Sequence, residues 1–167
     1  FGIHVNGYTY KEGEMHVWLG RRGQGVKVWP GKLDQMVAGG QPMGLTLEEN
    51  LVKEGAEEAG LSRKIMKQAR PCGALNYILP MREGIRRDTQ FVYDLELPED
   101  VTPVADGLEV GEFICLGAEE ARALLYERDA FKPNCVPVLA DFLIRHGVLT
   151  EETEPELCEI RALLYEM

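Results

Sequence analysis

Three glutamates in one short segment constrain the fold of this chain most. The segment from 53 to 61 reads K-E-G-A-E-E-A-G-L and contains Glu54, Glu57 and Glu58. In an α-helix, residues three and four positions apart share one face, so the three carboxylates lie about one turn apart. Like charges at this spacing repel, whereas a divalent cation such as Mg²⁺ prefers clustered carboxylate oxygens. The segment therefore predicts a metal-binding helix, and the alternative is an acidic helix face exposed to solvent.

The residues around this segment predict where its helix begins and ends. Thr46 followed by Glu49 is a capping-box pattern, which predicts a helix beginning at Leu47. Gly60 is the expected C-terminal stop, so the helix ends near Ala59. The acidic segment is thus expected to lie inside one short helix.

A short strand and a glycine loop are expected before this helix. Residues 33–38 (L-D-Q-M-V-A) read as the strand, and Gly39, Gly40, Pro42 and Gly44 read as a tight loop. Free backbone groups in such a loop can face a phosphate, while carboxylates on the helix hold a cation. This order of elements favours a cradle for metal and phosphate.

The composition predicts one globular domain. The chain has 167 residues, of which 45% are apolar and 28% charged. We see neither an apolar run near the ~18–20 residues of a membrane span nor a signal peptide. The four cysteines include no C-x-x-C pair and read as reduced thiols, so we expect a cytoplasmic protein. The net charge of −10 argues against a nucleic-acid partner.

The charge is unevenly distributed along the chain. Residues 1–87 carry 13 basic and 9 acidic side chains, a net +4, whereas residues 88–167 carry 5 and 19, a net −14. Arg21 and Arg22 follow the second expected strand, in a loop from which guanidinium groups can bind a diphosphate; the alternative is two solvated arginines. Trp29, in a W-P-G turn, is the aromatic side chain that we expect to contact a flat ring.

The remaining pattern predicts strands interleaved with helices, which indicates a mixed sheet between helices. Residues 3–10 and 15–19 read as a hairpin. Further strands are expected over 73–81, 89–97 and 111–116, with a charged turn at 82–88. Helices are expected over 118–126, 135–146 and 152–166, with Asn134 as a cap.

With these features in place, the chain resembles the Nudix hydrolases, whose box reads G-x5-E-x7-R-E-U-x-E-E-x-G-U with U aliphatic. Leu45 stands where the box has its first glutamate, Lys53 replaces the arginine, and Gly55 replaces an aliphatic residue. A glycine inside a helix costs ~1 kcal/mol relative to alanine, and it brings the helix backbone close to whatever packs on it. The matching positions are Gly39, Glu54, Glu57, Glu58, Gly60 and Leu61.

This resemblance implies a Nudix α/β/α sandwich and a site for Mg²⁺, with Mn²⁺ as the alternative. The implied ligands are Glu54, Glu57 and Glu58 with the Gly40 carbonyl, and Lys53 would take the role of the arginine that orients one glutamate. Leu45 removes a carboxylate near the metals, so the number of ions stays open.

The resemblance also implies a base for the reaction. In many Nudix enzymes a loop glutamate joins the metals or acts as base, and Glu109 in D-G-L-E-V is its counterpart here. Either Glu57 or Glu109 is expected to take a proton from the attacking water. The alternative for Glu109 is an ordinary turn carboxylate.

A narrower resemblance extends beyond the box. The stretches 1–8, 29–40, 49–54, 93–98 and 131–135 are similar to the Nudix subgroup fused to fungal thiamine pyrophosphokinase and found alone in plants and bacteria. It implies hydrolysis of damaged thiamine diphosphate to the monophosphate, by a single Nudix domain over 1–167 that lacks an upstream domain. The alternatives are a Nudix pyrophosphatase for nucleoside diphosphate derivatives such as ADP-sugars, and an inactive ligand-binding module. The sequence predicts no oligomeric state.

Overall fold

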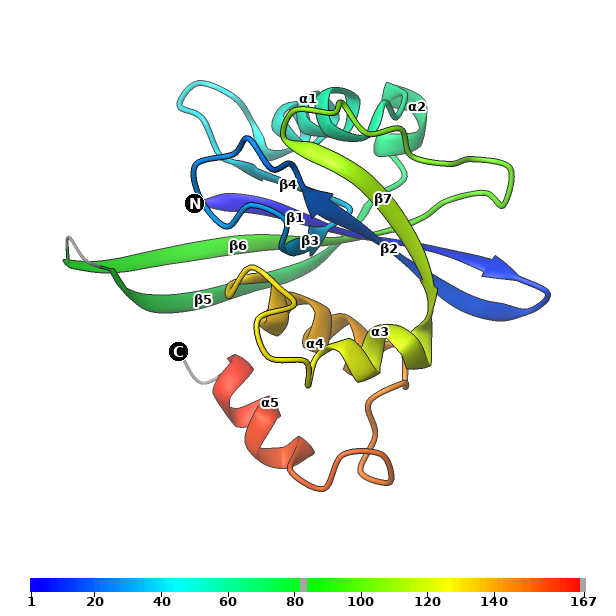
Figure 1. Ribbon diagram of the computed structural model, residues 1–167, viewed down its shortest axis with the longest axis vertical. Coiled ribbons are helices and arrows are strands. Elements are labelled where there is room, and N and C mark those ends of the chain that lie inside the picture. The colour runs from blue at the N-terminus through cyan, green and yellow to red at the C-terminus, as the bar shows by residue number, and fades with distance from the viewer. Residues whose placement is uncertain (82–83, 166–167) are drawn as a thin grey trace.

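A mixed β-sheet forms the centre of the molecule in the computed structural model, which describes residues 1–81 and 84–165 (Figure 1). Its main path runs β3-β2-β1-β6-β5, while β4 pairs with β1 and β7 pairs with β2. The strands are β1 (Gly2–Lys11), β2 (Glu14–Arg22), β3 (Leu33–Gln35), β4 (Val37–Gly40), β5 (Arg70–Met81), β6 (Gly84–Glu96) and β7 (Val110–Gly117).

Strand β1 connects the parts of the sheet that carry the site. It runs parallel to β6 and antiparallel to β2 and β4. Gly2 is the register partner of Gly40 on one side and of Gln90 on the other. Gly39 and Gly40, which were predicted in the glycine loop, are instead the last two residues of β4, because they pair with β1. The end of β4 and the first half of β6 therefore flank β1 on its two sides.

Helices cover both faces of the sheet. Helices α1 and α2 lie on one face, and α3 and α4 lie on the other, with α5 beyond α4 (Figure 1). This arrangement confirms the expected α/β/α sandwich with a mixed sheet between helices. The helices are α1 (Leu47–Ala59), α2 (Arg63–Met66), α3 (Ala118–Leu124), α4 (Cys135–Arg145) and α5 (Leu157–Tyr165).

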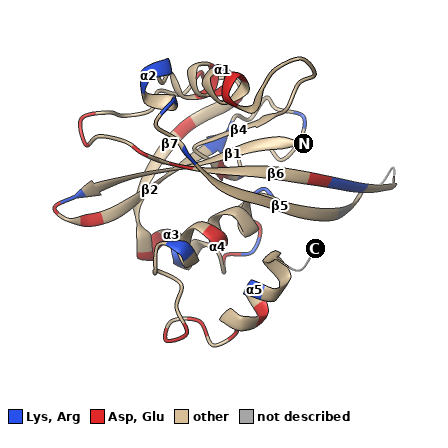
Figure 2. Cartoon of the chain, turned by 180° about the vertical axis from the view of Figure 1, so that it is seen from behind, with Lys and Arg blue, Asp and Glu red and all other residues tan. Residues whose placement is uncertain are grey.

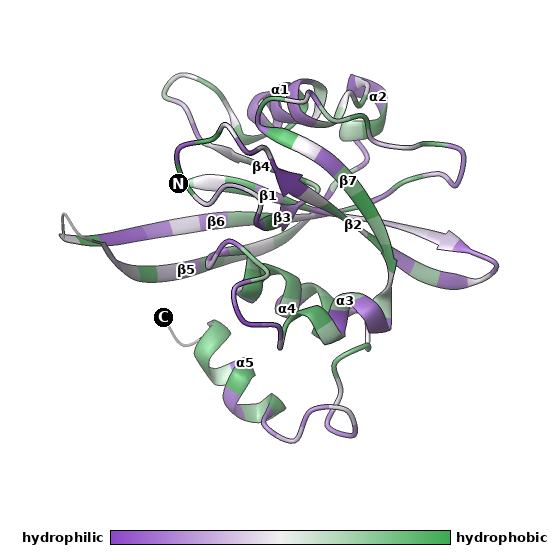
Figure 3. Ribbon diagram, in the orientation of Figure 1, coloured by the Kyte–Doolittle hydropathy of each residue, from purple (hydrophilic) through white to green (hydrophobic). Residues whose placement is uncertain are grey.

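Apolar side chains fill the space on each side of the sheet. One buried cluster joins Ile3 and Val5 of β1 to Leu51 of α1. A second joins the sheet to α4, which is largely apolar (Figure 3) and whose Leu139 and Phe142 are fully buried. Burying each large apolar side chain contributes about 1.5–3 kcal/mol, so both helix layers are held to the sheet mainly by this packing. Within the described part of the chain, no helix has the length and apolar character needed to cross a membrane.

The predicted acidic helix is confirmed. Thr46 and Glu49 form the capping box, and Gly60 ends the helix in the left-handed conformation with φ 62°. The strand predicted before it is divided into β3 and β4 around Met36. The division arises because β3 pairs with β2, whereas β4 pairs with β1.

Two predicted loops prove to be strands. Strand β2 extends through Arg22, so Arg21 and Arg22 lie on the sheet rather than in a loop. Pairing with β5 makes residues 84–88 part of β6, so the turn predicted at 82–88 is wrong there. Residues 82–83 of that prediction lie outside the described residues.

In the C-terminal half, the structure differs from the prediction in two further details. Asn134 makes no side-chain capping bond, because its own backbone is already helical with φ −75° and ψ −6°. The last helix begins at Leu157 rather than 152, because Pro155 disfavours a helical conformation at Glu154. The short helix α2 was not expected from the sequence.

Candidate active site

The site begins where Glu54 of α1 packs against Gly39 of β4. A Cβ atom added to Gly39 would lie 2.4 Å from Cδ of Glu54. Only glycine therefore leaves room for this carboxylate beside the strand. Gly55 likewise leaves room for the Met66 side chain of α2, because a Cβ atom added to Gly55 would lie 2.4 Å from Sδ of Met66. The expectation that Gly55 brings the helix backbone close to its neighbour is thus confirmed.

Glu58 is the most deeply buried of the three helix glutamates. It is 7% exposed, and its Oε2 accepts a hydrogen bond of 2.9 Å from the Ala38 N–H. Burial raises the pKa of Glu58 to about 8, and the nearby carboxylates of Asp34, Glu54 and Glu109 act in the same direction. A bound cation would remove the free-energy cost of placing these carboxylates close together.

Helix α1 carries acidic residues (Figure 2), of which Glu57 is exposed and paired with Lys53. The Lys53 Nζ lies 2.7 Å from Oε2 of Glu57 and 3.0 Å from Oε1 of Glu54. These hydrogen bonds, first to Glu57 and then to Glu54, raise the pKa of Lys53. Lys53 thus donates hydrogen bonds to two of the three predicted ligands, as expected of a residue that orients them.

Glu109 reaches the same region from the loop before β7. The side chain of Asp106 accepts hydrogen bonds from the backbone N–H groups of Leu108, Glu109 and Val110, which shapes this loop. Glu109 and Glu58 then line one small cavity, the acidic cavity, together with Gly20, Arg22, Asp34, Gln35, Ala38 and Val110. The structure therefore brings Glu109 close to the acidic helix, although 51 residues separate Glu109 from Glu58 in the sequence.

The two arginines predicted to bind substrate have different surroundings. Arg22 lines the acidic cavity, where its Nη1 lies 3.1 Å from Oδ2 of Asp34. The Arg21 Nε lies 2.6 Å from Oε1 of Glu112, and its Nη1 donates to the Gly31 carbonyl. Only Arg22 therefore lies next to the predicted metal ligands.

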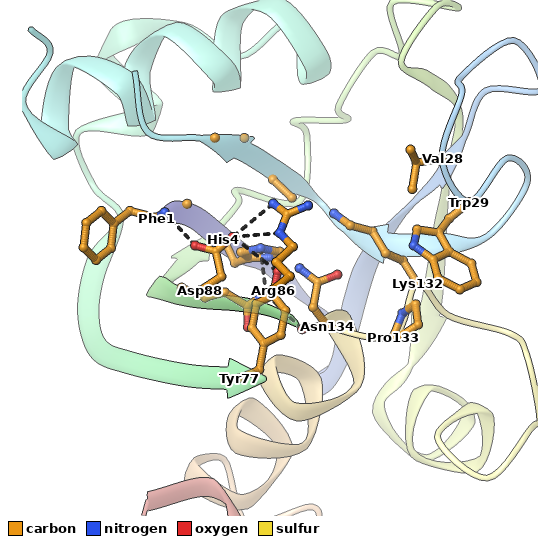
Figure 4. A pocket seen from close by; sticks show the side chains of 15 residues that line it. Phe1, His4, Val28, Trp29, Tyr77, Arg86, Asp88, Lys132, Pro133 and Asn134 are labelled. Atoms are coloured by element: carbon orange, nitrogen blue, oxygen red, sulfur yellow. Dashed lines mark hydrogen bonds and ion pairs between the residues drawn. The ribbon is translucent and has the colours of Figure 1, made fainter. Parts of the chain in front are cut away.

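A second hollow, the aromatic cleft, opens beside the glycine loop. Trp29 lines it with Tyr77, and its backbone φ of 56° confirms that it occupies a turn. Figure 4 shows Trp29 and Lys132 on one side of the cleft and Tyr77 on the other. Ala38 lines both the cleft and the acidic cavity, so the two hollows meet at β4. Other residues that line the cleft are Gly39, Gly40, Arg86, Asp88, Gln90 and Asn134.

Sequence reasoning missed most of the polar residues in this cleft. Arg86 was assigned to a turn, and that assignment is wrong, because Arg86 lies in β6. In β6, Arg86, Asp88 and Gln90 alternate with their neighbours and share one face of the strand, which lines the cleft. Lys132 and Asn134 enter through the F-K-P-N-C segment, and no local signal marked them as site residues.

The Gly40 carbonyl, a predicted metal ligand, already has one partner. It accepts a hydrogen bond of 3.0 Å from Nδ2 of the buried Asn50. A carbonyl oxygen has a second lone pair, so this bond leaves the predicted role open. Leu45 lies at the end of the same loop and is 37% exposed.

A buried polar group lies under the two hollows. Ligand atoms of His4, Asp34 and Cys135 lie within 4.8 Å of one another. Asp34 already pairs with Lys132 at 2.9 Å and accepts a bond from the Cys135 thiol, whose pKa is raised by burial. These partners, with the Gln35 and Gln90 side chains beside His4, satisfy the group without a metal.

Two plant proteins are similar to this chain in sequence. No family model matches the chain. The Arabidopsis thaliana proteins Nudix hydrolase 20, chloroplastic, and Nudix hydrolase 24, chloroplastic, are each 40% identical to it over 153 residues. The aligned region is 92% of this chain but 41% and 42% of the two relatives, so the chain spans less than half of their length.

Solved structures that share this fold include a NUDIX domain. The NUDIX domain of Shewanella oneidensis NrtR, solved in complex with ADP ribose, superimposes with a TM-score of 0.67 at 10% identity, covering 87% of this chain and 86% of that one. The chain is therefore a homologue of the Arabidopsis Nudix hydrolases and has the Nudix fold. The names of the Arabidopsis relatives place those proteins in the chloroplast, and the cytoplasmic location expected here stays a prediction.

Proposed function

We propose that this domain hydrolyses the diphosphate linkage of a small organic diphosphate with the help of a divalent cation. The observation that carries the proposal is the convergence of Glu54, Glu58 and Glu109 beside Gly39, next to a cleft with aromatic walls. Carboxylates from one helix and one distant loop have no structural reason to gather around one small cavity. The relatives named Nudix hydrolases support the same reading.

The residues present fit a hard divalent cation. Glu54 and Glu58, with Glu57 on the exposed side, supply carboxylate oxygens, and the raised pKa of Glu58 marks a position that lacks positive charge. The Gly40 carbonyl would complete the set. A bound Mg²⁺ or Mn²⁺ supplies charge that acidifies water and neutralises the phosphate oxygens.

Side chains of the protein supply proton transfer, positioning of the carboxylates and phosphate binding. Of the two candidate bases, Glu57 is held by Lys53 on the exposed side of α1, whereas Glu109 shares the acidic cavity with Glu58. We therefore assign proton transfer from the attacking water to the Glu109 carboxylate. Lys53 positions Glu54 and Glu57, and Arg22 can hold a phosphate oxygen at the edge of the cavity.

The substrate that we favour is a damaged form of thiamine diphosphate. This choice rests on the resemblance to the thiamine-linked Nudix subgroup and is supported by the Trp29 and Tyr77 side chains in the cleft. Damaged thiamine rings are neutral where the thiazolium of intact thiamine is cationic, so an enzyme that spares the cofactor should prefer them. ADP-sugars are the rival substrates, and an inactive binding module is the rival role.

A phosphate-release assay tests the reaction. We expect activity with Mg²⁺, none with EDTA, and a loss of several orders of magnitude in Glu57→Gln or Glu109→Gln. Glu99→Gln changes an exposed glutamate outside the site and is the matched control. Wild-type rates in Glu57→Gln with EDTA present would contradict the metal site.

The same assay ranks the substrates. We expect kcat/KM for oxidised analogues of thiamine diphosphate to exceed that for intact thiamine diphosphate, ADP-ribose and nucleoside triphosphates. A higher value for ADP-ribose would replace the thiamine assignment and keep the diphosphatase chemistry. Turnover of none of these compounds would favour the binding module.

A further inference from the structure

The floor of the aromatic cleft holds a buried acceptor that has no partner. Gln90 is 1% exposed, and its Nε2 lies 2.9 Å from Nε2 of His4 and 3.0 Å from the Asn134 carbonyl. Its Oε1 makes no hydrogen bond to any of residues 1–81 and 84–165. A buried polar atom without a partner is costly, so such an atom in the wall of a cleft indicates a ligand that completes it.

Gln90 lines the cleft, and the hydrogen-bond network around it determines which end of its amide is left without a partner. Gln35 donates from Nε2 to the Cys135 carbonyl, so its Oε1 must accept from His4 Nδ1, which lies 2.8 Å away. The His4 proton is then on Nδ1, and Nε2 is left as an acceptor for Gln90. Burial lowers the pKa of His4 to about 4, which keeps this neutral form. The amide of Gln90 therefore cannot be reversed without breaking two bonds.

Each cationic side chain that lines the cleft has a carboxylate partner. Lys132 pairs with Asp34 at 2.9 Å, and Arg86 pairs with Asp88 at 3.0 Å. The end of the cleft near Gln90 therefore suits an uncharged ring better than a phosphate. The end of the cleft formed by Gly39 and Gly40, where Glu54 lies against Gly39, suits the diphosphate when a cation is bound.

The strand register sets the distance between these two ends. Gly40 and Gln90 are both register partners of Gly2, so they lie on strands separated by β1. Two strand spacings amount to about 10 Å. A ligand that reaches both ends must carry its ring donor roughly this far from its phosphorus atoms.

We infer that Gln90 Oε1 selects substrates whose heterocycle carries an N–H donor, either an amino group or a ring N–H. This inference deepens the proposed function and rests on it. Gln90 acts in binding and discrimination, whereas the acidic helix acts in the reaction. A ring that lacks the donor would displace water from the cleft and leave Oε1 unpaired.

Paired ligands test the inference without any turnover. Thiamine monophosphate and adenosine monophosphate each carry an aromatic amino group as their N–H donor, and each has a deamino counterpart that lacks it. We expect the wild type, followed by quenching of tryptophan fluorescence, to bind the amino form of at least one pair about tenfold more tightly or better. Equal affinity within both pairs, or no binding of any of the four compounds, would overturn the inference.

A variant then assigns the effect to Gln90. Gln90→Met should bind the amino and deamino forms equally, whereas Gln68→Met, which changes an exposed glutamine outside the cleft, should discriminate as the wild type does. Discrimination that persists in Gln90→Met would overturn the inference, and if this variant fails to fold, the wild-type comparison still decides. Hydrolysis of methyl diphosphate, which has no ring, tests the proposed function separately.

Discussion

Replacing Glu58 with glutamine should stabilise the metal-free protein and abolish its response to Mg²⁺. Burial, with Asp34, Glu54 and Glu109, raises the pKa of Glu58 from 4.5 to about 8. Between these values the unfolded chain releases a proton that the folded protein keeps, so the free energy of unfolding falls as the pH rises. At ~1.4 kcal/mol per pKa unit, this loss of stability is at most ~5 kcal/mol at pH 8 and at most ~1 kcal/mol at pH 5.

The glutamine variant removes this penalty and keeps the local structure. The side-chain oxygen of glutamine can still accept the bond from the Ala38 N–H. Relaxation of the neighbouring carboxylates reduces this loss, so we expect a gain of about 2–5 kcal/mol at pH 8 and much less at pH 5. Urea unfolding with EDTA measures the gain at both pH values, and the exposed Glu99→Gln is the control.

Two results would refute this reasoning. A Glu58→Gln variant no more stable than the wild type at pH 8 would show that the carboxylate is ionised in the folded protein at no cost. Equal stabilisation of variant and wild type by Mg²⁺ would show that Glu58 is not a ligand. The expected pattern is a large Mg²⁺ effect on the wild type alone.

Three further changes test the same structure. Gly39→Ala should weaken Mg²⁺ binding, because a Cβ would occupy the space of the Glu54 carboxylate; an unchanged Mg²⁺-dependent shift in Tm would contradict this. Leu45→Glu should change the Mg²⁺ titration while altering stability by less than ~0.5 kcal/mol, and identical titrations would show that this position has no part in the site. Arg145→Met should destabilise the protein by about 3–5 kcal/mol in urea unfolding near neutral pH, because it leaves the buried carboxylate of Asp94 without its cation. Burial alone would raise the pKa of Asp94, but bonds from neighbours that include Arg145 hold it well below 3.8, so this loss should shrink as the pH falls below 3.8.

Local sequence signals were enough to predict the acidic helix. The capping box at Thr46, the stop at Gly60 and the spacing of the glutamates act within a few residues of each other, and the structure contains all of them. The hairpin of β1 and β2 was predicted for the same reason, because alternation and a short turn are local properties. The close packing of the helix backbone at Gly55 was also predicted correctly, because a glycine inside a helix indicates close packing whichever residue packs against it.

The aromatic cleft was decided by the tertiary structure alone. Gln90 and Gly40 become neighbours of Gly2 only because β1 pairs with β4 on one side and with β6 on the other. The side that a strand residue faces depends on where the strand begins, so assigning 84–88 to a turn concealed that Arg86 lines the cleft. Single positions in the sequence carry no record of these pairings, because the free energy that selects them comes from contacts between residues far apart in the chain. The sequence by itself therefore determined the acidic helix, whereas the surroundings of Glu109, Arg86 and Gln90 exist only once the sheet has formed.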